Sequence, residues 1–124
     1  MEFRIDRAVI EYVVDFSREF YPREFMALLR AKRGENFFRI HEVVFAPGLK
    51  SGTRSATFDP SLIPHYFDVI GTVHSHPTPN PEPSREDLRM FSTYPVNMIV
   101  FHPFRDDCWI AYDRMGAPLH IVIS

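Results

Sequence analysis

The feature that most constrains this chain is an apolar run that leads into a proline-rich segment and then into a helix start. Residues 69–73 have the composition of a buried strand. The run ends in His74-Ser75-His76, and four of the next seven residues, 77–83, are proline. Proline fixes φ and lacks the backbone N–H, so this segment is neither a helix nor a central strand. The chain therefore leaves the strand through a stiff loop of restricted shape.

The two histidines of this run are expected to share one face. Side chains alternate along a strand with a period of two, so His74 and His76 point the same way and Ser75 points the other way. We expect Ser75 to be a second-layer or core residue without a catalytic part. Ser84 begins the next helix and Asp87 follows three positions later, so the loop can return this carboxylate to the histidines. Two histidines and a carboxylate are typical of catalytic zinc, whose fourth tetrahedral position is left for water.

Each of these residues also has an ordinary structural explanation. Ser84 and Asp87 match a helix capping box, although Glu or Gln is more common at the third position, and carboxylates in a first turn complement the helix dipole. Two histidines in a strand can equally be hydrogen-bonded core residues. The combination of all of them on one stiff loop favours the metal site.

This arrangement resembles a known motif. His74-Ser75-His76, seven residues to Ser84 and two more to Asp87 match the pattern H-x-H-x7-S-x2-D of the JAMM (JAB1/MPN/Mov34) zinc metalloproteases. The resemblance implies one Zn²⁺ per chain, bound by His74, His76 and Asp87. It also implies that the Ser84 hydroxyl can donate to a developing oxyanion while its oxygen caps the helix.

The same resemblance points to a general acid/base. The family has a glutamate after the first helix and just ahead of an apolar strand, and Glu24 stands in this position within Pro22-Arg23-Glu24-Phe25. The large residues Phe25 and Met26 follow it here, where the family usually has small ones. Three other glutamates fit this position less well: Glu11, Glu19 and Glu35.

Periodicity and turn signals predict the other elements. Apolar residues three and four apart predict a helix over residues 5–20, which Tyr21-Pro22 ends. Strands are expected over residues 25–33, 37–45, 69–76, 96–101, 108–112 and 119–123, with a short edge strand over 55–58. A short helix or turn is expected over residues 61–67 and a second main helix over 84–94, with Leu88, Met90 and Phe91 packing inward. The order predicts an α/β sandwich, and it resembles the MPN (cytidine-deaminase-like) fold, a mixed, mostly antiparallel sheet flanked by two main helices.

Composition narrows the class of protein. The chain of 124 residues suits a single domain over residues 1–124, and its formal net charge of −2 argues against a nucleic-acid binder. The single cysteine, Cys108, lies in an apolar stretch and is expected to be an inert buried thiol. The charged N-terminus and the absence of a long apolar run indicate a cytoplasmic protein without a membrane span.

The resemblance implies hydrolysis of amide or isopeptide bonds after the C-terminal Gly-Gly of a ubiquitin-like modifier or sulfur-carrier protein. Within this family, the chain resembles the stand-alone prokaryotic and archaeal proteins. The sequence is compatible with a homodimer. Two alternatives remain: a non-catalytic MPN-type interaction scaffold, and a DNA-associated protein of the RadC-like branch, against which the charge balance argues.

Overall fold

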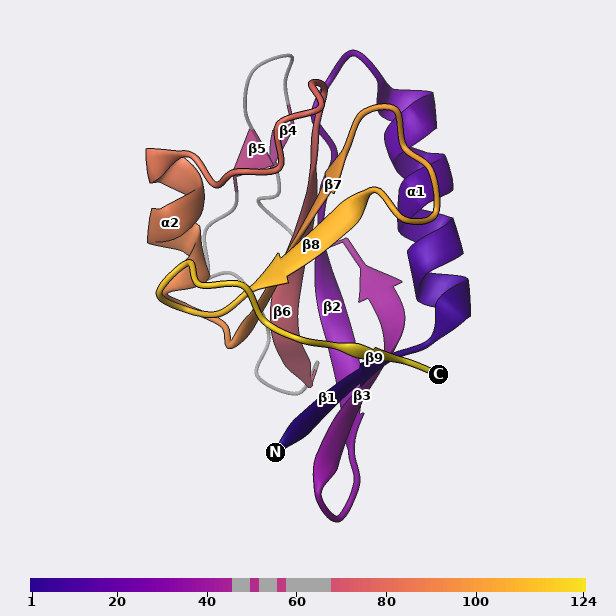
Figure 1. Cartoon of the computed structure of the whole chain (residues 1–124), viewed down its shortest axis with the longest axis vertical. Coiled ribbons are helices and arrows are strands. Elements are labelled where there is room, and N and C mark those ends of the chain that lie inside the picture. Colours follow the sequence, from indigo (N-terminus) through magenta and orange to yellow (C-terminus); the bar gives the residue numbers. More distant parts are fainter. Residues whose placement is uncertain (46–49, 52–55, 58–67) are drawn as a thin grey trace.

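A seven-stranded mixed sheet forms the centre of the molecule (Figure 1), and the computed structural model describes residues 1–45, 50–51, 56–57 and 68–124. The strand order is β8-β7-β6-β2-β3-β1-β9, and β4 and β5 pair separately. In chain order the elements are β1 (Glu2–Ile5), α1 (Arg7–Phe20), β2 (Met26–Arg33), β3 (Phe37–Val44), β4 (Lys50–Ser51), β5 (Ala56–Thr57), β6 (Val69–His76), α2 (Arg85–Phe91), β7 (Val96–Phe101), β8 (Trp109–Tyr112) and β9 (Val122–Ile123).

The sheet contains antiparallel and parallel pairs side by side. Strand β2 is antiparallel to both β3 and β6, and β7 is antiparallel to β8. Strand β6 is parallel to β7, and β1 is parallel to both β3 and β9. The mixed sheet is therefore as expected, but its parallel share is larger, because β1 was not expected and contributes two of the parallel pairs.

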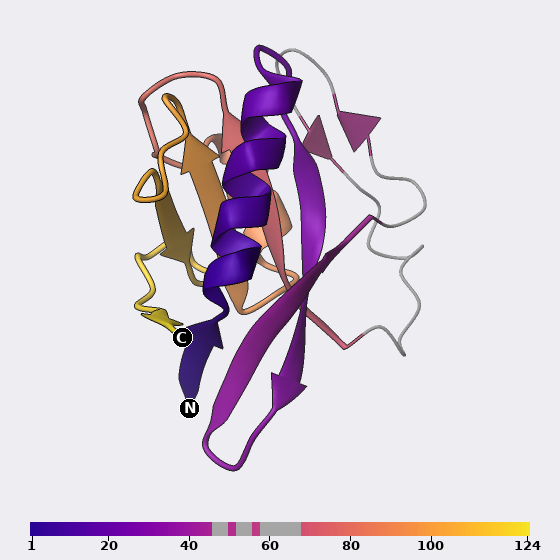
Figure 2. The same cartoon turned by 90° about the vertical axis from the view of Figure 1, so that its right-hand side faces the viewer.

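The two helices cover opposite faces of the sheet (Figure 1). The apolar stripe of α1 packs on alternate residues of β2, β6 and β7, and the resulting core includes Val13, Ala27, Val73 and Val100. On the other face Phe91 of α2 packs in a cluster with buried residues of β7 and β8. Seen from the side of α1, the β2–β3 hairpin extends past the rest of the sheet (Figure 2).

The first helix begins later than expected. Ile5 lies in β1 and is fully buried, and α1 starts only at Arg7. Asp6 has an extended backbone at the helix N-cap, and its N–H donates to the carbonyl of Ile40 in β3. Ile5 fits both the period of the helix and the alternation of a strand, and pairing with β3 decides in favour of the strand.

The second helix is shorter than expected and turns a different face inward. It ends at Phe91, and the Asn97 side chain donates to the carbonyls of Phe91 and Tyr94 beyond this end. Leu88 was expected to pack inward but is 42% exposed and lies over Gly116. The buried positions are Asp87 and Phe91, which are four residues apart, and Met90, as expected, packs partly buried against Met26 and Leu28 of β2.

The remaining strand predictions differ mainly in length. Residues 69–76 and 96–101 match β6 and β7, whereas the closing strand is reduced to Val122–Ile123. Ala56–Thr57 forms β5 within the expected edge strand. The helix expected over residues 61–67 lies outside the described residues. Within the part of the chain that the structure describes, no helix is long and apolar enough to span a membrane.

Candidate metal centre

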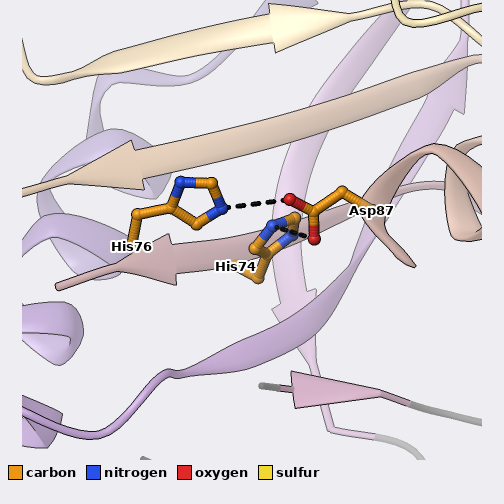
Figure 3. A group of neighbouring side chains, drawn as sticks. All are labelled: His74, His76 and Asp87. Atoms are coloured by element: carbon orange, nitrogen blue, oxygen red, sulfur yellow. Dashed lines mark hydrogen bonds and ion pairs between the residues drawn. The ribbon is translucent and has the colours of Figure 1, made fainter. Parts of the chain in front are cut away.

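Strand β6 is an inner strand of the sheet, and it carries the two histidines at its C-terminal end. His74 pairs with Met26 of β2 on one side and Ile99 of β7 on the other, and it is 1% exposed. His76 ends the strand and is half-buried. Both rings lie on the same side of β6 and turn toward Asp87 (Figure 3), as the alternation of the strand predicts.

The start of α2 positions the carboxylate. The Ser84 hydroxyl oxygen accepts from the N–H of Asp87 at 3.1 Å, and Asp87 Oδ2 accepts from the N–H of Ser84 at 2.7 Å. These two bonds form a complete capping box, so the structural explanation of this pair holds. The cap does not exclude a second role for the carboxylate, because Asp87 Oδ1 faces His74 and Oδ2 also faces His76.

The ligand atoms of the three residues converge. His74 Nε2 lies 3.0 Å from Asp87 Oδ1, and His76 Nε2 lies 3.1 Å from Asp87 Oδ2. One such atom from each residue lies within 4.8 Å of the others. Two ligands on a tetrahedral zinc ion at about 2.0–2.1 Å from the metal are themselves about 3.3 Å apart. The two histidine–aspartate spacings are therefore close to those of a zinc ligand set.

The hydrogen bonding of the rings shows that the group fits a cation. His76 Nδ1 lies 3.0 Å from the carbonyl oxygen of Asn80, which can only accept, so Nδ1 carries the proton. In a neutral ring Nε2 then presents a lone pair to a carboxylate, and this pairing needs a cation or a second proton between the two atoms. His74 is buried, and neither of its ring nitrogens has an aligned hydrogen bond among the described residues, despite the short distance to Asp87.

The charges within the group favour an ionised carboxylate. Burial opposes ionisation of Asp87, but contacts with His74 and His76 and the N–H of Ser84 outweigh it and hold the pKa of Asp87 well below its usual range. Burial likewise opposes charging of His76, yet Asp87 and the Asn80 carbonyl raise the pKa of this histidine above its ordinary value. A carboxylate that stays ionised beside two imidazoles is the donor set expected for a divalent metal.

Glu24 lies beside this group without belonging to its ligand atoms. It is half-buried just before β2 and interacts electrostatically with His76 and Asp87. Burial raises the pKa of Glu24 to about 7; the charge of His76 opposes this shift, and Asp87 and Glu86 add to it. The next side chain, Phe25, is fully buried on the opposite face of the sheet, so its size leaves the site open.

The structure also adds two residues that the sequence interpretation did not identify. The Asn80 carbonyl orients His76, and the Tyr112 hydroxyl donates to the carbonyl of Pro81 at 2.7 Å. Asn80 Oδ1 accepts from the N–H of Glu82, an Asx turn that Asn between two prolines favours. No local pattern connects Tyr112 with a loop 31 positions earlier.

Comparison with known proteins gives consistent relatives. A Haloferax volcanii protein named "Probable metalloprotease" is 32% identical over 113 residues, which cover 86% of this chain and 70% of that protein. A JAB1/MPN domain protein from Archaeoglobus fulgidus has a TM-score of 0.74 at 26% identity, covering 99% of this chain and 97% of its own. The structure described as "JAMM: A Metalloprotease-like Zinc Site in the Proteasome and Signalosome" has a TM-score of 0.75 at 27% identity, covering 100% and 99%.

A family model covers most of the chain. The model for prokaryotic homologues of the JAB domain matches residues 6–112, which run from the N-cap of α1 to the end of β8 and include every residue of the candidate metal centre. The structural neighbours share the MPN fold over nearly their whole length. The chain therefore belongs to the family of prokaryotic homologues of the JAB domain.

Proposed function

We propose that this protein is a zinc-dependent peptidase that hydrolyses amide bonds after the C-terminal Gly-Gly of ubiquitin-like modifier or sulfur-carrier proteins. The observation that carries the proposal is the convergence of His74 Nε2, His76 Nε2 and Asp87 on one point, with the tautomer of His76 set by the Asn80 carbonyl. In this proposal residues 1–124 act as a single JAMM/MPN domain that binds one zinc ion.

Zinc bound by these three ligands would polarise the carbonyl of the substrate and activate a water for the attack. The chain's own residues supply the proton transfers and the positioning. A carboxyl with a pKa of about 7 suits a group that must accept and return a proton near neutral pH, and Glu24 has this value. Glu24 is therefore the proposed general base during attack and the proposed acid toward the leaving amine.

The Ser84 hydroxyl hydrogen is proposed to stabilise the oxyanion that develops during attack on the carbonyl. Its oxygen accepts from the N–H of Asp87 in the capping box, and this bond does not use the hydroxyl hydrogen. The same cap holds Ser84 and Asp87, which supports a preorganised hydroxyl in the proposed role. Donation to an oxyanion from such a group is typically worth about 2.7–4 kcal/mol of the barrier.

Similarity to the family supports the proposed substrate class. One relative is named "Probable metalloprotease", and one structural neighbour is described as a metalloprotease-like zinc site in the proteasome and signalosome, which is compatible with a protease that acts on modified proteins. The formal net charge of −2 fits a protein substrate better than a nucleic acid. A cytoplasmic location without membrane attachment completes the proposal.

Mass spectrometry of a small ubiquitin-like protein that ends in Gly-Gly and is extended by a short peptide tests the proposal. We expect zinc-loaded protein to cut after Gly-Gly, and a chelator or Glu24→Gln to stop the cut while Glu24→Gln still binds one zinc per chain. Chelator-resistant cleavage would contradict the zinc mechanism. Zinc binding without any cleavage would instead support the non-catalytic scaffold.

A further inference from the structure

Ser75 is a buried polar residue to which the proposed chemistry assigns no role. It lies between the two histidines of β6, is 1% exposed, and points to the face of the sheet that α1 covers. A buried hydroxyl in such a place costs free energy unless it is hydrogen-bonded. Its partner is therefore informative.

The partner of Ser75 is the backbone of Phe25, the residue that follows Glu24. The N–H of Phe25 donates to Ser75 Oγ at 2.7 Å, and the N–H of Ser75 donates to the carbonyl of Phe25 at 2.8 Å. These two hydrogen bonds, called the Ser75 bracket below, join β6, which carries the two histidines, to the segment that carries Glu24.

This bracket replaces a regular step of the β-ladder. The pairing of β2 with β6 ends at Met26 opposite His74, so the next antiparallel pair would be Phe25 opposite Ser75. In a regular hydrogen-bonded pair, the N–H of Phe25 would donate to the main-chain carbonyl of Ser75. The side-chain hydroxyl takes that place, just before the first residue of β2, Met26.

The Phe25 side chain is held in the core by contacts separate from its backbone bonds to Ser75. Its ring is fully buried and packs against Phe16 and Phe20 of α1, with centroid distances of 4.8 and 5.8 Å. On the N-terminal side the N–H of Arg23 donates to the carbonyl of Phe20. Glu24 is thus carried on a short link between an anchored turn and the Ser75 bracket.

We propose that Ser75 is a positioning residue for Glu24: its hydroxyl binds the N–H of Phe25 and thereby sets the position of the Glu24 carboxylate relative to the metal ligands. This role rests on the proposed function, in which Glu24 moves the proton. It also gives a reason for a serine between two histidines, since the hydroxyl serves one face of β6 while the imidazoles serve the other.

The test compares Ser75→Ala with Ser75→Thr, which keeps the hydroxyl, and with Ser17→Ala as a matched control. Ser17 is equally buried, but its hydroxyl donates to the carbonyl of Val13 within α1, on an element that carries no ligand. We expect Ser75→Ala to keep one zinc per chain and its KM on the Gly-Gly fusion. Its kcat should fall on the order of 10²-fold, the usual effect of a displaced catalytic group. Ser75→Thr should regain most of the loss, and Ser17→Ala should change kcat by less than about twofold.

Two readouts that need no turnover separate this inference from the proposed function. In Ser75→Ala the Phe25 amide should exchange with solvent about five- to tenfold faster, as loss of one hydrogen bond implies. The NMR signal of the Glu24 carboxyl carbon should shift at fixed pH, and neither change should occur in Ser17→Ala.

If the wild-type protein cleaves nothing, the proposed function fails and these readouts still decide the role of Ser75. If Ser75→Ala does not fold, Ser75→Cys provides the same comparison. An unchanged kcat or an unchanged Glu24 signal in a folded variant would overturn the inference.

Discussion

Asp87 combines two requirements that usually fall on different residues. Its Oδ2 atom closes the capping box with the N–H of Ser84, and both of its oxygens face imidazole nitrogens at 3.0 and 3.1 Å. A glutamate, which is more common at this capping position, has one more methylene and would move the carboxylate by about 1.5 Å. The less common choice of aspartate therefore agrees with a carboxylate that must reach the cap and the histidines together.

Glu24 gives a prediction at the scale of a single residue. Burial raises its pKa from the ordinary value of 4.5 to about 7, so the folded protein keeps a proton that the unfolded chain loses between these values. The resulting stabilisation is fully present below pH 4.5 and is lost as the pH rises through about 7. In chelator, we expect the free energy of unfolding to fall over this range on the order of 1–2 kcal/mol, after allowance for partial exposure.

Urea denaturation at a series of pH values measures this slope. Glu24→Gln should flatten it, whereas Glu19→Gln, an exposed change on α1, should leave it intact. The raised pKa of His76 acts in the same direction but only above its ordinary value of 6.5, so the slope between pH 4.5 and 6.5 reports Glu24 without His76. An equal slope in the Glu24→Gln protein would show that Glu24 is not the group that titrates.

At the scale of elements, the site depends on how the proline-rich loop is held between β6 and α2. The Tyr112 hydroxyl of β8 donates to the carbonyl of Pro81 in the middle of this loop, and the Tyr112 ring stacks on Phe91 of α2 at 5.7 Å. One tyrosine of β8, in the same sheet as β6, thus contacts both the loop and the helix that it leads into. The prolines restrict the shape of the loop, and Tyr112 fixes its place on the sheet.

Tyr112→Phe should loosen the loop while the ring contact stays. Loss of one neutral hydrogen bond is worth about 1 kcal/mol, so the affinity for zinc should fall about fivefold. Competition with a chromogenic chelator measures this affinity, and Tyr12→Phe, which changes an exposed hydroxyl on α1, serves as the control. Equal affinities of Tyr112→Phe and wild type would mean that the loop is defined without the Tyr112 hydroxyl.

Elements with a strong local pattern were predictable from the sequence. Strands β6 and β7 are apolar runs bounded by turn residues, and their observed limits match the expected ones. Strand β1 was missed because Ile5 also fits a helical period and its pairing with β3 and β9 involves remote residues. The prediction that Leu88 packs inward was wrong for a related reason. The helix is oriented so that Asp87 contacts His74 of β6, and Leu88 is then exposed.

The residues of the candidate site also fall into those that the sequence predicted and those that only the structure reveals. His74, His76, Ser84 and Asp87 lie in one short motif, and the structure brings them together. Glu24 came from resemblance, and the structure adds its burial and its electrostatic contact with His76 and Asp87. The role of Tyr112 depends on packing between distant segments, so no sequence pattern near the motif could reveal it.

The whole molecule brings separate segments to one buried place, and metal binding should therefore stabilise the entire fold. Ligands from β6 and α2 are held in contact only in the folded state, so zinc bound there adds RT ln(1 + [Zn]/Kd), about 2.7 kcal/mol at 100 times Kd. For a domain of this size the melting temperature should rise on the order of 10 °C. His76→Ala should abolish the rise in calorimetry, because two ligands seldom hold zinc, and His41→Ala on β3 should retain it. Equal zinc shifts in both variants would place the stabilising metal elsewhere on the protein.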